Sequence, residues 1–74
     1  KINHPGMTSD KVLVYTTNQL FEAEMIKQFL YDHDIQAFIL NKMDSTYLFG
    51  DIEILVSRDD VINSKRLIED FLNQ

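Results

Sequence analysis

Three short segments of this chain are runs of mostly apolar residues of strand length, and each predicts a β-strand; the third also alternates between apolar and polar residues. The segments are residues 11–16, 35–40 and 51–57, all rich in β-branched and aromatic side chains. Elsewhere the apolar residues recur every three or four positions, which predicts helices over residues 19–33 and 59–72. The predicted order of elements is therefore β-α-β-β-α.

Capping residues support both helix starts. Thr17 and Asn18 precede the first helix, and their side-chain oxygens can accept hydrogen bonds from its free amides. Ser57, with Asp60 three residues later, is a weaker capping signal for the second helix.

The order of elements restricts the topology. A strand–helix–strand crossover is right-handed and makes its two strands parallel. The third strand then fits best between them and antiparallel to both, which gives the spatial order 1-3-2. With both helices on one face, this is an α+β, ferredoxin-like half-sandwich that lacks the usual fourth strand.

Strand periodicity also predicts which side chains lie on each face of the sheet. The face under the helices is expected to hold small and β-branched residues: Val12, Val14, Ile35, Ala37, Ile39, Ile52, Ile54 and Val56. The other face is expected to hold the candidate interface residues Leu13, Tyr15, Phe38, Leu40 and Leu55, with Gln36, Glu53 and Ser57. A sheet face that meets water should be mostly polar, so this apolar face predicts an interaction surface. Cover by the N-terminal tail or a neighbouring domain, and an ordinary surface, are the alternatives.

Without a fourth strand, the first strand is an edge whose unpaired amides can pair with another chain. Lys11 at its start gives only light protection. A domain of 74 residues without cysteine gains no stability from disulfides, and small domains of this kind often oligomerise. We therefore expect a homo-oligomer, preferably a dimer paired edge to edge, or an unidentified protein partner.

Composition narrows the class of protein further. The chain has no cysteine and its two histidines, His4 and His33, are far apart, so we expect neither a metal nor another cofactor. The net charge is −5 and the basic residues are scattered, which argues against nucleic-acid binding. Because neither a membrane-spanning run nor a signal-peptide pattern is visible, we expect no membrane partner and a cytoplasmic protein.

Residues 1–6 show no periodicity and contain the only proline, and Met7 has the character of a natural start. We predict that residues 1–6 are an artificial remnant or a disordered tail. Residues 7–74 are predicted to form a single domain.

Residues 41–50 form a connection of ten residues where a tight hairpin needs about two to five. Long loops on rigid scaffolds often carry binding sites. The candidate site residues are Asn41, Asp44, Ser45, Thr46, Tyr47 and Gly50. The alternative is a solvated loop whose Leu48 and Phe49 pack against the core.

No catalytic arrangement is recognisable, so we predict that the protein is not an enzyme. Residues 16–19 contain neither the glycine nor the arginine that a phosphate-binding loop after the first strand would need. Glu22 and Glu24 point to different sides of the predicted helix, which indicates a solvated face rather than an acid–base pair. Stacking of RNA bases on Tyr15 and Phe38 is conceivable, but the acidic balance opposes it.

Several short segments resemble one known family. Residues 14–18 and 22–24 resemble its opening, and residues 35–41, 44–45 and 49–56 resemble its middle. The family is the bacterial "putative signal transducing protein" domain of unknown function, which is placed near the PII-type (GlnB-like) nitrogen-regulatory proteins. The resemblance covers about residues 11–71 and implies a ferredoxin-like fold.

The resemblance also implies a regulatory role, with residues 41–50 in the position of the PII signalling loop. That loop is shorter here, and the basic residues that bind nucleotide phosphates in PII proteins have no counterpart. We expect a regulatory protein-interaction module that associates with itself through the sheet. The alternative is a small-ligand sensor that binds at the 41–50 loop or in a cleft between subunits.

Overall fold

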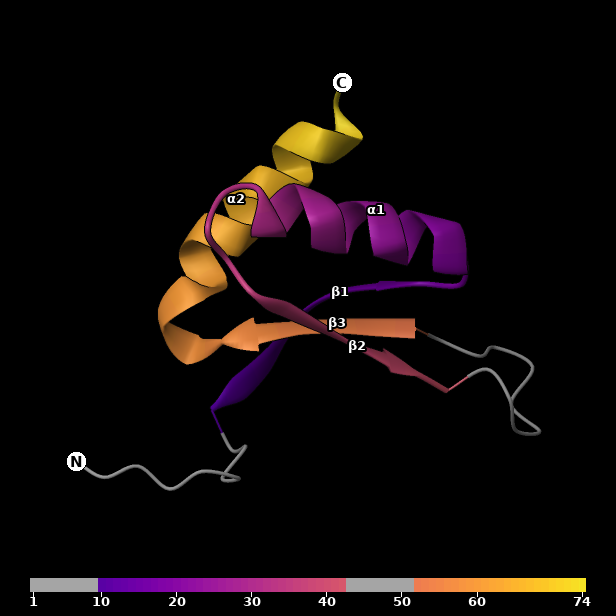
Figure 1. Ribbon diagram of the computed structural model, residues 1–74, viewed down its shortest axis with the longest axis horizontal. Coiled ribbons are helices and arrows are strands. Elements are labelled where there is room, and N and C mark those ends of the chain that lie inside the picture. The colour runs from indigo at the N-terminus through magenta and orange to yellow at the C-terminus, as the bar shows by residue number, and fades with distance from the viewer. Residues whose placement is uncertain (1–9, 43–51) are drawn as a thin grey trace.

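The computed structural model describes residues 10–42 and 52–74, and its elements follow the predicted order (Figure 1). They are β1 (Lys11–Thr17), α1 (Leu20–Tyr31), β2 (Ala37–Asn41), β3 (Ile52–Ser57), a 3₁₀ turn η1 (Arg58–Asp60) and α2 (Val61–Leu72). The strands form one sheet in the order β1-β3-β2, and β3 is antiparallel to both neighbours. Both helices lie on the same side of this sheet (Figure 1). The predicted α+β architecture and strand order are confirmed.

The helix ends differ from the predicted ones. The residue before α1 is Gln19, and no side chain caps the helix; Thr17 Oγ1 accepts a hydrogen bond from the Gln19 amide at 3.1 Å instead. Neither Ser57 nor Asp60 makes a capping hydrogen bond. The capping predictions are therefore wrong, although the helices begin within a few residues of the predicted positions.

The second strand begins at Ala37 rather than at Ile35. The amide of Ile35 donates a hydrogen bond to the carbonyl of Leu30, at 2.9 Å, in the turn that ends α1. Within this turn Asp34 has a φ of 68°, in the left-handed region that aspartate tolerates better than most residues. β2 therefore begins two residues later than predicted, because Ile35 takes part in this turn.

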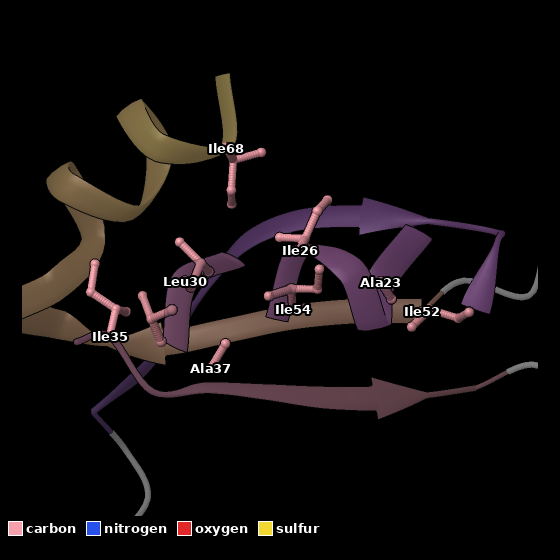
Figure 2. Packing of buried hydrophobic residues seen from close by; sticks show 9 residues of the cluster. Ala23, Ile26, Leu30, Ile35, Ala37, Ile52, Ile54 and Ile68 are labelled. Carbon is pink, nitrogen blue, oxygen red and sulfur yellow. The ribbon is translucent and has the colours of Figure 1, made fainter. Parts of the chain in front are cut away.

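The core lies between the helices and the sheet. Ala23, Ile26 and Leu30 form one buried stripe on α1, at the spacing expected for an amphipathic helix. The central strand contributes Ile52, Ile54 and Val56, and Figure 2 shows side chains from both layers projecting into the same space. The cluster is completed by Ile35, Ala37 and Ile68.

A β-bulge in β1 changes the face on which Tyr15 lies. Leu13 pairs with Leu55 and Tyr15 pairs with Ile54, so Val14 is an extra residue in the strand. The prediction that Tyr15 lies on the bare face is wrong, because Tyr15 packs against the core together with Val14. The extra residue shifts the alternation by one position, and Thr16, which pairs with Glu53, is exposed on the bare face instead.

Candidate functional site

The bare face of the sheet carries a row of apolar side chains that crosses all three strands. Leu13 pairs with Leu55, and Leu55 pairs with Phe38, so the three residues lie side by side from β1 through β3 to β2. Leu40 follows on β2, opposite Glu53. We call Leu13, Leu55, Phe38 and Leu40 the apolar belt. Four of the five predicted interface residues are thus brought together, and Tyr15 is not among them.

The belt is open to solvent at both edges of the sheet. Leu13 is 44% exposed, Phe38 39% and Leu40 47%, while Leu55 on the central strand is half-buried. The other side of the same strands is closed by the helices. The belt is therefore separate from the core, and a change at its surface need not disturb folding.

Charged side chains flank the belt at both ends. The Lys11 ammonium lies 4.5 Å from the centroid of the Phe38 ring, a cation–π contact. At the other end Lys42 Nζ lies 3.3 Å from Glu53 Oε2. A shallow depression on this face is lined by Lys11 and by the belt residues Phe38, Leu40 and Leu55. An apolar strip bordered by charges is the composition that partner-binding surfaces commonly show.

The predicted loop site falls largely outside the described residues. Asn41 is described: it ends β2, where it pairs with Ile52. Asp44, Ser45, Thr46, Tyr47 and Gly50 lie outside the described residues, as do residues 1–6. The loop site therefore stays a prediction.

A hydrogen-bonded cluster joins the end of β1 to the start of α1. Glu22 Oε1 accepts a hydrogen bond of 2.6 Å from the Thr17 hydroxyl and a longer one, of 3.4 Å, from the Tyr15 hydroxyl. Burial raises the pKa of Tyr15, and the negative charge and hydrogen bond of Glu22 raise this pKa further. Sequence reasoning placed Glu22 on a solvated face and missed this cluster, because the bulge that turns Tyr15 toward α1 leaves no periodic signal.

This cluster predicts a loss of stability in alkaline solution. The folded-state pKa of Tyr15 lies above its ordinary value of 10.0, so the stabilisation is fully present below pH 10 and is lost as the pH rises through the folded-state pKa. We expect the free energy of unfolding, measured by urea titration, to fall less steeply above pH 10 in Tyr15→Phe than in the wild type. Tyr31→Phe removes the hydroxyl of a tyrosine that is 67% exposed and serves as the control. Equal slopes for all three proteins would contradict the assignment.

Two further observations hold for residues 10–42 and 52–74. No helix there is long and apolar enough to cross a membrane. No group of three or more histidine, aspartate or glutamate side chains there is placed to hold a metal ion.

Comparison with known proteins identifies a family for this chain. The family model described as "Putative prokaryotic signal transducing protein" matches residues 11–71, from the start of β1 to the last turn of α2. Neither the curated proteins nor the solved structures contain a match. Because the matched segment includes every helix and strand described above apart from the last residue of α2, this chain belongs to the family of prokaryotic proteins described as "putative" signal transducers.

Proposed function

We propose that this domain is a regulatory protein-interaction module of the cytoplasm that associates with itself through its sheet. The family description supports a role in signalling. The observation that carries the proposal is the apolar belt, which places Leu13, Leu55 and Phe38 in one row on a face without helices. A regulatory module needs a surface that can bind without unfolding the domain, and the belt is separate from the core.

The energetics of a small domain favour a second copy as the occupant. Burial of apolar surface contributes roughly 25 cal/mol per Å², and three of the four belt side chains are at least 39% exposed. A small domain of 74 residues has a small core, so burial of even part of the belt in a dimer adds stability that the monomer lacks.

The strand arrangement supports the same proposal. The order β1-β3-β2 with two helices on one side is consistent with a ferredoxin-like sheet that lacks its fourth strand. The outer strands then have edges that no described strand covers, and a second copy can supply the missing pairing.

Sedimentation velocity over a concentration series tests self-association. We expect the wild type to sediment as a dimer at high concentration and Phe38→Asp to sediment as a folded monomer, because the new carboxylate would lose water against apolar side chains of the second copy. Ile62→Asp introduces the same charge at a site on α2 that is 78% exposed, and it should remain dimeric.

A wild type that stays monomeric at every concentration would overturn the proposal. The alternative, a small-ligand sensor that binds at residues 41–50 or between subunits, predicts a different result. A ligand that binds only the folded domain must raise its melting temperature, whatever its oligomeric state.

A further inference from the structure

The two edges of the sheet differ in how well they can accept another strand. β1 is interrupted by the bulge at Val14 and begins with Lys11, and both features discourage edge pairing. β2 pairs with β3 in unbroken register from Ala37 to Asn41. Along its outer side, alternate amides and carbonyls face no other strand of the described chain. The structure therefore favours the β2 edge over the β1 edge that the sequence suggested.

A groove runs beside this β2 edge. α1 packs over β2 and β3, and its outward side chains border the groove. The groove has a volume of about 550 Å³ and is lined by Glu24, Lys27, Gln28 and Tyr31 of α1 and by residues 36–39. An added strand beside β2, with a helix above it, can therefore approach without displacing α1.

The charged side chains that α1 contributes to the groove can pair with the same side chains of a second copy. Glu24 and Lys27 are one turn apart on the same wall, and neither makes an ion pair within the described part of the chain. A two-fold axis near Ile39, the middle of β2, would make a second β2 antiparallel to the first and set the two α1 helices antiparallel as well. Glu24 of each copy then faces Lys27 of the other, and the pair occurs twice.

We propose that the second copy binds by pairing its β2 with β2 across this two-fold axis, which makes one continuous sheet. The proposal rests on the proposed function, since it names the edge through which self-association occurs. On the bare face, Phe38 of each copy lies beside Leu40 of the other, because the axis lies between them at Ile39. The two apolar belts therefore join into one surface twice as wide.

Charge reversal tests this arrangement. Glu24→Lys places two like pairs across the axis, and Lys27→Glu does the same with the opposite sign. Each variant alone should show a dissociation constant raised about tenfold or more at low ionic strength. An equimolar mixture should recover wild-type affinity, because the mixed dimer places a lysine against a glutamate at both contacts. Lys65→Glu makes the same charge change on α2 and should leave the dimer unchanged.

Leu13→Lys separates this inference from the proposed function. Leu13 lies on β1, at the far side of the sheet from β2, so the edge-paired dimer should tolerate this change. If Leu13→Lys abolished the dimer while charge reversal at Glu24 and Lys27 left its dissociation constant unchanged, the two copies would be stacked through their bare faces instead. That result would overturn the β2 pairing and leave self-association intact. A monomeric wild type would overturn both.

Discussion

Replacement of Ile54 with alanine is expected to lower the free energy of unfolding by about 2–5 kcal/mol. Ile54 is fully buried at the middle of the central strand, where it pairs with Tyr15 on one side and Ile39 on the other. Figure 2 shows its side chain in the layer between α1 and the sheet. Truncation there removes apolar contacts with the surrounding core residues and leaves a cavity among them.

Urea unfolding followed by circular dichroism measures this loss. Small domains are stable by only about 5–15 kcal/mol, so Ile54→Ala should remove a large share of the free energy of unfolding and lower the urea concentration at the midpoint. Ile62→Ala removes the same atoms from a side chain that is 78% exposed and should change stability by about 0.5 kcal/mol or less. Losses of equal size in the two variants would contradict the described core.

The second large effect is expected at two neighbouring residues of β1. Tyr15→Asp should cost about 2 kcal/mol more than Thr16→Asp, because only Tyr15 packs against the core. In the wild type the Glu22 carboxylate accepts a hydrogen bond from the Tyr15 hydroxyl. In Tyr15→Asp the new carboxylate would lie near Glu22 and be repelled by it. Thr16 is exposed and pairs with Glu53 on the bare face, where an added charge remains hydrated.

The same unfolding titration compares the two variants. Both place aspartate in the same outer strand, so its poor strand propensity is common to both and cancels in the difference. If Thr16→Asp proved the more damaging change, β1 would have an unbroken alternation and no bulge at Val14. The comparison therefore tests the register of β1 directly.

These two results also bear on the proposed function. If the core lies on the helix side and the belt lies on the bare side, Phe38→Asp should abolish self-association and keep the fold. A binding surface separate from the core allows a small domain to gain or lose a partner without unfolding. This separation is what makes the belt suitable for a regulatory module.

The sequence by itself determined the order of elements and the topology. The three- and four-residue spacing of Ala23, Ile26 and Leu30 and the alternation of Ile52, Ile54 and Val56 are local patterns, and both elements form as these patterns predict. The right-handed crossover rule then left one reasonable order of strands, and it is the order observed. All four residues of the belt were also predicted, because the period of two holds along β2 and β3 and is interrupted in β1 only after Leu13.

Only the tertiary structure decided the side of Tyr15, the contact with Glu22 and the choice of edge. A bulge forms where one strand has an extra residue relative to its partner strand. It therefore depends on which residues pair, and the hydrophobic pattern of the strand alone does not reveal it. The groove beside β2 likewise joins Lys27 of a helix to Phe38 of a strand, and their proximity depends on how α1 lies across the sheet. Periodicity is a property of one segment, whereas register and grooves are properties of segments packed together.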